Sequence, residues 1–305
     1  MQPDTYILII NRRSGKQDAE IRVDRIRRLF AQHGAPLEVL EFGKENSLAE
    51  VTRKALQTED ATIVVAGGDG TVCGVSELVV GTGRKMGIIP SGTFNYFARS
   101  LDIPEDIDAA VQVILSGETE LTKVGRINDR VFLNNASLGA YPAILQTREG
   151  IYHRWGRSRV AAYWSVIKAL ATLRAPMRLT VTVDGTKHRY RTPLIFAVNN
   201  AFQLEQMALG GADCIAAGEM VLLVAPDTDR WGMLKLALAL AVGMARKKVD
   251  YELHCGKDIR IEMARKRRHV ARDGELDKMR GPFRLTLSQD KLDVLVPSGR
   301  KEQTR

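Results

Sequence analysis

The sequence predicts an α/β protein of two domains: an N-terminal doubly wound α/β domain and a C-terminal antiparallel β-sandwich-like domain with helical insertions. Three observations lead to this prediction. The 305 residues are enough for two cores, strand and helix patterns alternate up to Gly117, and short strand patterns dominate after it. We expect the first domain at residues 1–122, which the C-terminal strand 290–305 can join, and the second at residues 123–289.

The N-terminal elements begin with "YILII" (Tyr6–Ile10), whose unbroken apolar run is typical of a buried strand. Residues 19–34 have a helical pattern, and residues 37–42 have the pattern of a second strand. The next helix is expected to begin at Ser47, where Glu50 completes a capping box. The apolar positions expected on the buried face of the first helix are Ile21, Ile26, Leu29 and Phe30.

Two further strand patterns follow, "ATIVVA" (Ala61–Ala66) and "KMGIIP" (Lys85–Pro90). A helical pattern comes after each of them, and residues 105–117 have the pattern of another helix. Strands that alternate with helices of this length indicate βαβ units. The sheet of the first domain is therefore expected to be parallel, with helices on both faces.

The second half of the chain consists mainly of short strand patterns with turns rich in Gly, Asp and Pro. Helical patterns interrupt them near Arg159–Leu173 and Trp231–Arg246. This mixture is typical of an antiparallel β domain with inserted helices. The strand patterns are "RVFLNNAS", "RLTVTVDG", "KHRYRTPLIFAVNN", "EMVLLVAP", "DIRIEMA", "FRLTLS" and "KLDVLVP".

Charge and cysteine content limit the classes of protein to consider. The net charge of +9 gathers partly in two basic clusters, at residues 245–248 and 264–269. Such clusters suit nucleic acid, anionic lipid or a solvated face, but no nucleic-acid-binding motif accompanies them, so we expect no nucleic-acid partner. The three cysteines are widely spaced and form no CxxC pair, which predicts no disulfide framework and favours a reducing cytoplasm. No apolar run reaches the roughly 18 residues that a membrane span needs.

The stretch "TIVVAGGDGTVCGVSEL" places three glycines and a carboxylate between a buried strand and a helix. Glycine lets a backbone approach phosphate closely, and a helix N-terminus presents amide groups and a positive dipole end to an anion. Asp69 can orient Mg²⁺ or a nucleotide hydroxyl, and Thr71 adds a hydroxyl group. The alternative is a purely structural turn. The segment matches neither a Walker A loop nor GxGxxG, so we expect a nucleotide phosphate held in another way.

Two more turns of small residues support this hypothesis. "PSGTFNYFAR" follows the strand at Lys85–Pro90, and "NRRSGK" (Asn11–Lys16) follows the first strand. Because the carboxyl ends of parallel strands meet at one edge of a sheet, these turns are expected to converge on one ligand.

The combination of GGDGT, PSGTxNxFAR and the later "RDGE" (Arg272–Glu275) resembles the diacylglycerol kinase catalytic-domain family, which includes bacterial lipid kinases and the sphingosine and ceramide kinases. The resemblance extends from "NRRSG" to the strand after "RDGE". GGDGT alone is shared with NAD kinases and is related to phosphofructokinases, so the combination is what makes the resemblance specific. It implies an ATP-dependent lipid kinase with an α/β nucleotide domain and a β-sandwich-like domain.

The resemblance also implies roles for particular residues. Asp273 matches the general base that accepts the proton of the lipid hydroxyl, and Glu275 is expected near the nucleotide. Mg²⁺ is expected to arrive with ATP, near Asp69. Read alone, Asp273-Gly274 is also compatible with an ordinary hairpin turn. The residues expected to hold ATP are Asn11, Gly67, Gly68, Asp69, Gly70, Thr71, Gly92 and Thr93.

The chain departs from the family pattern in three places. Tyr96 stands where the family usually has Asp after Gly-Thr-x-Asn, and Lys123 stands where an Asp usually opens the strand before "FLN". In bacterial lipid kinases these acids help organise magnesium-linked water. Ala217-Gly218 replaces a common Asp-Gly, so no metal site is assigned there. Two alternatives remain open: an enzyme similar to NAD kinase, and a nucleotide-binding regulator with impaired catalysis.

A lipid kinase must reach a bilayer surface, and two segments could do so. Trp231–Arg246 is apolar, is followed by Lys247 and Lys248, and is too short to span a membrane. Residues 151–173 combine aromatic residues with arginines. For both, packing on the β domain is the alternative. We expect a lipid substrate, an anionic membrane surface and a cytoplasmic, peripheral location at the inner face of the membrane; a homodimer is compatible with the sequence.

Overall fold

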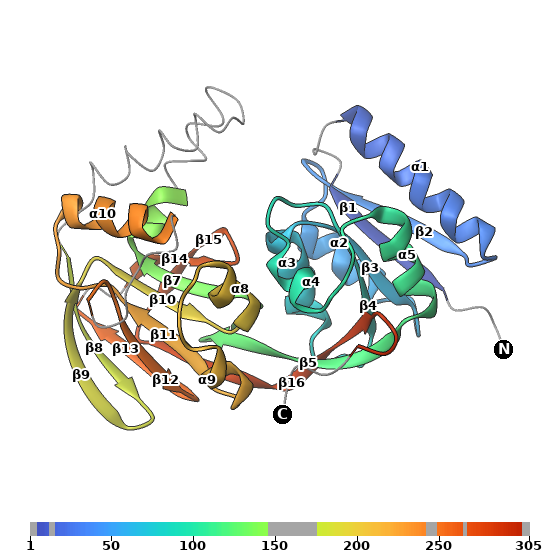
Figure 1. Cartoon of the computed structure of the whole chain (residues 1–305). Helices are drawn as coiled ribbons and strands as arrows, with labels where there is room; N and C mark the ends of the chain where they lie inside the picture. Colours follow the sequence, from blue (N-terminus) through green and yellow to red (C-terminus); the bar gives the residue numbers. More distant parts are fainter. Residues whose placement is uncertain (1–4, 12–15, 146–175, 242–248, 265–266, 301–305) are drawn as a thin grey trace. The chain divides into compact units, whose positions relative to one another are not determined.

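The computed structural model describes residues 5–11, 16–145, 176–241, 249–264 and 267–300. The chain divides into two compact units, which are coloured along the sequence in Figure 1. Unit 1 combines Met1–Val124 with Ser288–Glu302, and unit 2 is built on Gly125–Leu287. The domain limits expected from the sequence were 1–122 with 290–305, and 123–289.

Unit 1 contains a parallel sheet with the strand order β2-β1-β3-β4. Its helices cover both faces, so the predicted doubly wound architecture is confirmed: α1 and α5 contact each other, as do α2 and α3. The strands are β1 (Tyr6–Asn11), β2 (Leu37–Phe42), β3 (Thr62–Gly67) and β4 (Lys85–Pro90), and the helices are α1 (Lys16–Gln32), α2 (Leu48–Ala55), α3 (Asp69–Val79), α4 (Tyr96–Ser100) and α5 (Ile107–Ser116).

The start of α2 confirms the predicted capping box: the Ser47 hydroxyl accepts the amide of Glu50, and the Glu50 carboxylate accepts the amide of Ser47 at 2.7 Å. The predicted buried face of α1 is wrong at one position. Ile21 is 63% exposed, whereas Val23 is buried together with Ile26 and Phe30. Positions 23, 26 and 30 follow the i, i+3, i+7 spacing of one helical stripe, and position 21 lies off that stripe.

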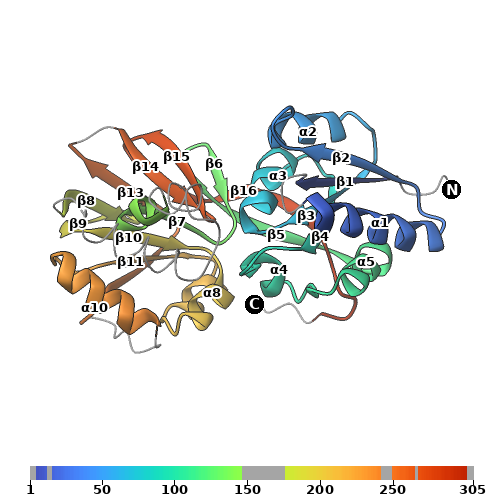
Figure 2. The same ribbon diagram turned by 90° about the horizontal axis from the view of Figure 1, so that it is seen from above.

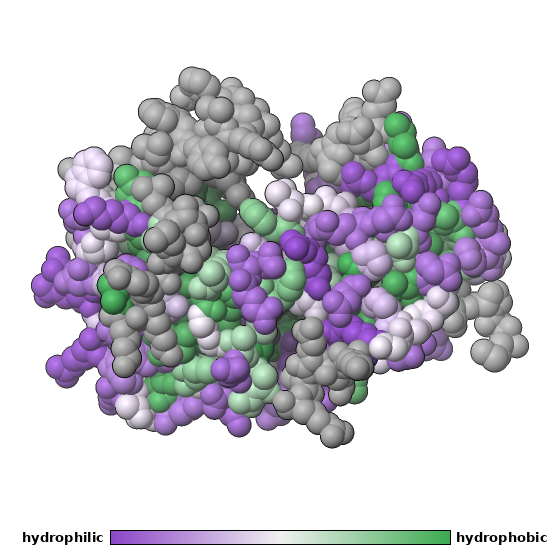
Figure 3. Space-filling view, in the orientation of Figure 1, coloured by the Kyte–Doolittle hydropathy of each residue, from purple (hydrophilic) through white to green (hydrophobic). Residues whose placement is uncertain are grey.

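Two strands run from one unit into the other. They are β5 (Glu118–Ile127) and β16 (Phe283–Val296). In unit 1, Asp293 and Val294 of β16 pair in parallel with Lys85 and Met86 of β4. The C-terminal strand therefore extends the parallel sheet of unit 1. Purple, hydrophilic side chains predominate on the face of unit 1 that Figure 3 shows, as expected where amphipathic helices cover a sheet.

Unit 2 has two antiparallel sheets whose facing side chains form one apolar core, and this confirms the predicted sandwich-like fold. One sheet has the order β12-β11-β10-β7-β14-β15, and the other pairs β9, β8 and β13 with β16. The remaining strands are β6 (Arg130–Phe132), β7 (Asn135–Gly139), β8 (Met177–Val183), β9 (Thr186–Thr192), β10 (Leu194–Val198), β11 (Met220–Val224), β12 (Glu252–Gly256), β13 (Asp258–Met263), β14 (Arg267–Arg272) and β15 (Glu275–Arg280).

The helices of unit 2 include α8 (Ala201–Gln206), α9 (Ala212–Ala216) and α10 (Arg230–Ala241), and residues 140–145 are also helical. Helices α8 and α9 lie between β10 and β11, where the sequence analysis placed no helix. Figures 1 and 2 both show α10 beside the six-stranded sheet, where Met233 and Leu236 pack with Ala140 and Ala225. The predicted segment 151–173 and the end of the predicted helix at 231–246 lie outside the described residues.

The expectation of no disulfide is wrong, because Cys214 and Cys255 are bonded, with their Cα atoms 5.9 Å apart. They are 41 residues apart in the sequence. Pairing of β11 with β12, and packing of α9 on β11, bring them together, and spacing along the chain carries no sign of that. Cys73 is buried and is not part of this disulfide.

Candidate active site

The three predicted turns of unit 1 begin at one level of its sheet. The register pairs Ile10 of β1 with Ala66 of β3, and Gly67 of β3 with Pro90 of β4. Asn11, the GGDGT turn and the PSGT turn therefore follow neighbouring parallel strands at their carboxyl edge. This is the edge at which open α/β sheets bind ligands.

The two glycine turns touch each other. The amide of Ser91 donates to the carbonyl of Gly67 at 2.9 Å. A Cβ atom on Gly92 would lie 2.6 Å from the Cα of Gly68, and one on Gly68 would lie 3.0 Å from the Cα of Gly92. Neither glycine has a left-handed backbone, since Gly68 has φ −91° and Gly92 is absent from the positive-φ residues. Close backbone approach, and not positive φ, is what requires glycine here.

Asp69 and Asn95 hold the second turn in place. Asp69 Oδ1 accepts the amide of Phe97 at 3.1 Å, which ties the first residue of α3 to the start of α4. Buried Asn95, in the left-handed region at φ 49°, accepts the amide of Gly92 at 2.9 Å and donates to its carbonyl and to Glu105. The sequence hypothesis gave Asp69 a ligand role only and gave Asn95 none, although the motif itself contains both residues.

The N-terminus of α3 lies within the GGDGT turn, because Gly68 is the N-cap and Asp69 is the first helical residue. Gly68 is the N-cap and supplies no side-chain hydrogen bond to the helix. Val72, Val75 and Val79 are buried and anchor the helix against the sheet. A fixed helix N-terminus beside two glycine turns is suited to an anion such as phosphate.

Tyr96 occupies the position of the expected Asp, but its phenol cannot act as a carboxylate. It is stacked on Phe94, with ring centroids 5.4 Å apart and planes 2° from parallel. Burial and the negative charge of Asp69 raise the pKa of Tyr96, so the phenol stays neutral at ordinary pH. Among the described residues, no group of three potential metal ligands lies at these turns. Mg²⁺ would be held there mainly by nucleotide phosphates, with Asp69 as the nearby carboxylate.

Asp273 lies in unit 2, in the two-residue turn between β14 and β15. Asp273 has φ 44° and Gly274 has φ 87°, as a type I′ hairpin turn requires. The backbone of this dipeptide therefore forms the ordinary hairpin turn that the sequence also allowed. The Asp273 side chain does more than form a turn. Its carboxylate accepts the amides of Leu133 at 2.6 Å, Asn134 at 2.8 Å and Asn135 at 3.0 Å.

Neutral polar side chains surround this carboxylate. Asn134 accepts a hydrogen bond from Asn200 at 2.7 Å, and Asn135 donates one to Gln203 at 3.1 Å. Asn200 is also the N-cap of α8. Asp273 and these four amide residues are all at most 6% exposed. Within the part of the chain that the structure describes, Asn135 Oδ1 and Ser137 Oγ are buried without a hydrogen-bond partner. In the sequence, the asparagines of this group are visible only as two Asn-Asn pairs within or at the end of strand patterns.

The predicted site residues thus fall into two groups. Asn11, Gly67–Thr71, Gly92 and Thr93 gather at one edge of unit 1. Asp273 and Glu275 belong to unit 2, where Glu275 is the exposed first residue of β15 and pairs with Arg272. Arg272 is buried and donates to Asp277 at 2.5 Å and to the carbonyl of Val131, which fixes the base of the hairpin.

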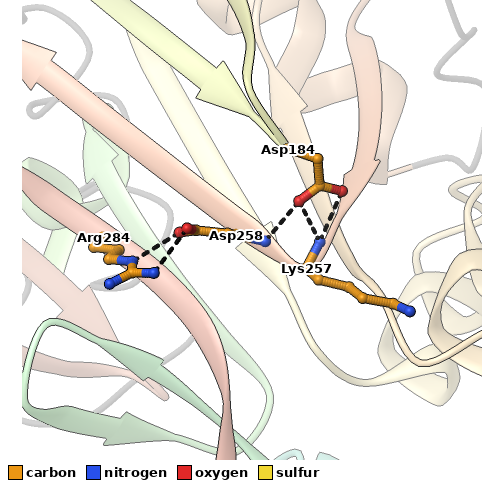
Figure 4. Close-up of polar contacts among 4 residues, drawn as sticks. All are labelled: Asp184, Lys257, Asp258 and Arg284. Atoms are coloured by element: carbon orange, nitrogen blue, oxygen red, sulfur yellow. Dashed lines mark hydrogen bonds and ion pairs between the residues drawn. The ribbon is translucent and has the colours of Figure 1, made fainter.

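A second Asp-Gly hairpin turn in unit 2 has the same construction. Asp184 (φ 45°) and Gly185 (φ 89°) join β8 to β9. As Figure 4 shows, the Asp184 carboxylate accepts the amides of Lys257 and Asp258, at 3.1 and 2.9 Å. Asp258 in turn accepts two hydrogen bonds of 2.8 Å from Arg284. This turn is exposed and carries none of the predicted site residues.

Comparison with known proteins finds a family model that matches the first part of the chain. Residues 5–127, which hold both glycine turns, match the diacylglycerol kinase catalytic domain. This match supports the resemblance read from the two glycine motifs, over the first part of the chain.

Proteins with similar sequences carry kinase names. A diacylglycerol kinase of Staphylococcus carnosus (strain TM300) is 33% identical over 137 residues, which is 43% of this chain and 44% of that protein. A probable lipid kinase YegS-like protein of Klebsiella pneumoniae (strain 342) is 30% identical over 143 residues, 46% and 47% of the two chains. The matched regions thus span less than half of each relative's length.

The likeness in three dimensions extends further. A solved structure described as a putative diacylglycerol kinase from Bacillus anthracis str. Sterne has a TM-score of 0.72 to this chain and covers 97% of it and 98% of its own length. At 20% sequence identity, this likeness shows a shared fold. None of the helices in the described part of the chain has the length and apolarity that a membrane crossing needs.

Proposed function

We propose that this protein is an ATP-dependent lipid kinase that transfers the γ-phosphoryl group to a lipid hydroxyl. The observation that carries the proposal is the contact between the GGDGT and PSGT turns beside the uncapped N-terminus of α3, within residues that match a kinase catalytic domain. Diacylglycerol, ceramide and sphingoid bases all offer a suitable hydroxyl, and the acceptor is one of this class.

The residues of unit 1 bind and orient the phosphate chain in this proposal. Phosphoryl transfer depends mainly on positioning and on neutralising charge, and bound Mg-ATP supplies the transferred group and the metal charge. The α3 amides and the hydroxyls of Thr71 and Thr93 contact phosphate oxygens. Asp69 keeps the two turns in register through the amide of Phe97.

In unit 2, Asp273 takes the proton of the lipid hydroxyl as that oxygen bonds to phosphorus. Three backbone amides fix the direction of its carboxylate. Glu275 serves the nucleotide, so Glu275→Gln is expected to raise the KM for ATP in steady-state kinetics while the KM for lipid stays unchanged. The reverse pattern would place Glu275 on the acceptor side.

Membrane contact is peripheral in this proposal. Trp231, at the start of α10, is 63% exposed, while Met233 and Leu236 of the same helix are buried against the β domain. An exposed Trp beside basic residues suits an anionic interface. Vesicles with anionic lipid should sediment the protein at low salt, and both added salt and Trp231→Ser should weaken binding. Equal binding to neutral vesicles, without salt dependence, would contradict this part of the proposal.

The decisive experiment is transfer of radiolabelled phosphate from ATP with Mg²⁺ to diacylglycerol, ceramide and a sphingoid base in mixed micelles, beside NAD and a reaction without acceptor. Labelled lipid is expected. Labelled NADP would favour the activity of NAD kinase, and ATP binding without transfer to any acceptor would indicate a regulator.

Two threonine variants test where ATP binds. Thr71→Val removes one hydroxyl from the glycine turn and should raise the KM for ATP by about tenfold, since a hydrogen bond to a charged group contributes roughly 1.5–3 kcal/mol. Thr119→Val is the matched control, because Thr119 is exposed on β5 of the same unit. Equal KM values for the two variants would contradict the proposal that ATP binds at this turn. A substitution of Gly68 is less informative, since its Cβ would press on Gly92.

A further inference from the structure

Three potential metal ligands meet in unit 2, where α9 lies beside the β12 edge of the six-stranded sheet. The Sγ atoms of Cys214 and Cys255 and a carboxylate oxygen of Glu219 all lie within 4.8 Å of one another. All three side chains are partly buried. Among the described residues this is the one such group. Two independent features of the backbone bring it together.

The first feature is the end of α9. The amide of Glu219 donates to the carbonyl of Cys214, and that of Gly218 donates to the carbonyl of Ile215, with Gly218 at φ 75°. This is a Schellman motif, and it brings the side chains at its C3 and C″ positions together. Those positions are Cys214 and Glu219. The side chains at these two positions are usually apolar, and here they are a cysteine and a glutamate.

The second feature is the register of two strands. Val221 of β11 lies opposite Cys255 of β12. Glu219 is two residues before Val221, so Glu219 and Cys255 are diagonal neighbours on the same face of the sheet. That face carries α9, because Val221 packs with Cys214 and Ile215. The sheet and the helix end therefore place all three ligands independently of the disulfide.

Two thiolates and a carboxylate form a ligand set for a soft or borderline divalent cation. Zn²⁺ binds Cys sulfur at about 2.3 Å and carboxylate oxygen at about 2.0–2.2 Å, and a water molecule can complete its four positions. Mg²⁺ prefers oxygen ligands, so this site differs in kind from a magnesium site. We propose that the reduced protein binds one Zn²⁺ through Cys214, Cys255 and Glu219, and that this ion replaces the disulfide as the link between α9 and β12.

The exchange balances with a reductant of the thiol or phosphine class. Two thiols reduce the Cys214–Cys255 bond and become a disulfide, or one phosphine reduces it with a water molecule and becomes a phosphine oxide. Either reaction leaves two protein thiols. Binding of Zn²⁺ then releases both thiol protons, and the Sγ atoms separate by side-chain rotation to about 3.8 Å, as two tetrahedral Zn–S bonds require. The oxidised protein has no thiolate to offer, so the two links exclude each other.

The test is a zinc titration of the full chain, reduced with a phosphine, against a chromophoric chelator. One equivalent of Zn²⁺ should bind, and none to the oxidised protein at the same zinc concentration. Cys214→Ser and Cys255→Ser should abolish stoichiometric binding. Glu219→Gln should weaken it by at least about tenfold, the lower end of the effect of removing even an outer-shell partner. Asp213→Asn, a change at a neighbouring acid of α9, and Cys73→Ala are the matched controls and should leave it unchanged.

Two further measurements keep the test decisive even if a variant misfolds. Co²⁺ in place of Zn²⁺ should show thiolate-to-metal charge-transfer absorption in the reduced wild type and in Asp213→Asn. Zn²⁺ should also raise the thermal midpoint of the reduced wild type, because a ligand that binds only the folded state stabilises it. Absence of zinc binding by the reduced wild type would overturn the proposal, and so would equal binding by the oxidised protein or by Cys214→Ser.

Discussion

The two Asp-Gly turns of unit 2 have the same construction in different surroundings. In each, both central residues have positive φ, and the aspartate carboxylate accepts amides of a neighbouring segment. Each aspartate amide also donates back to that segment, Asp184 to the carbonyl of Asp258 and Asp273 to that of Asn135. Asp184, however, is exposed among charged residues, whereas Asp273 is 5% exposed among neutral amides.

The likeness of the two turns shows that a turn aspartate can accept backbone amides from a neighbouring segment without a catalytic role. We call this arrangement a carboxylate clasp. Asp184 forms it at an exposed edge, with Lys257, Asp258 and Arg284 as neighbours (Figure 4). The clasp alone therefore does not identify Asp273 as a general base. What separates Asp273 is its burial, its amide surroundings and its place in the "RDGE" motif. Asp184 is consequently the natural control for every substitution of Asp273.

The largest expected difference in stability is between Asp273→Asn and Asp184→Asn. An asparagine turns an NH₂ group toward amide donors, so at least one hydrogen bond to a charged acceptor is lost. In the buried turn this should lower the free energy of unfolding by about 3 kcal/mol, against about 1 kcal/mol where water can replace the bond. Urea denaturation followed by circular dichroism measures both. Equal losses would mean that burial adds nothing to the clasp of Asp273.

A smaller loss is expected when the amide network around Asp273 is cut at Asn200. Asn200→Ala removes the N-cap of α8 and the donor to buried Asn134, for a loss of about 2 kcal/mol. Asp106→Ala removes only a cap, that of α5, and should cost about 1 kcal/mol. The same denaturation experiment compares them. If the two losses coincide, the Asn134–Asn200 bond makes no net contribution.

The smallest effect is expected at the exposed turn and depends on pH. The Arg284 guanidinium, through its hydrogen bonds, lowers the pKa of Asp258 below its usual range. Because the folded pKa lies below the unfolded value of about 3.9, this contribution is complete above that value and is lost as the pH falls through the folded pKa. Arg284→Gln should slightly lower the thermal midpoint at pH 7, and the difference from wild type should vanish once the pH lies below the folded pKa of Asp258. A difference that persists in acid would point to packing of the arginine stem.

Local patterns allowed much of unit 1 to be predicted. The strands β1 to β4, the capping box at Ser47 and the meeting of the two glycine turns all follow from periodicity, short-range chemistry and the geometry of parallel sheets. Ile21 was wrongly assigned to the buried face of α1, because it was chosen for its hydrophobicity and not for its angular position around the helix axis.

Unit 2 depends more on contacts between residues distant in the sequence. The Asn134–Asn200 bond joins positions 66 apart, and Asp273 reaches amides 138 to 140 positions away. The Cys214–Cys255 disulfide arises from strand register and a helix end. No local pattern encodes such pairs, so the sequence could name Asp273 from its motif but could not show what its carboxylate contacts.

The role of Asp273 is tested by single-turnover phosphoryl transfer with saturating ATP and a lipid acceptor, using Asp273→Asn and Asp184→Asn at a temperature where both variants are fully folded. Loss of a general base typically slows a reaction by about 10²–10⁴-fold. We expect Asp273→Asn to fall in that range, with ATP still bound, and Asp184→Asn to transfer phosphate at nearly the wild-type rate. Equal rates for the two variants would show that Asp273, like Asp184, only holds a hairpin in place.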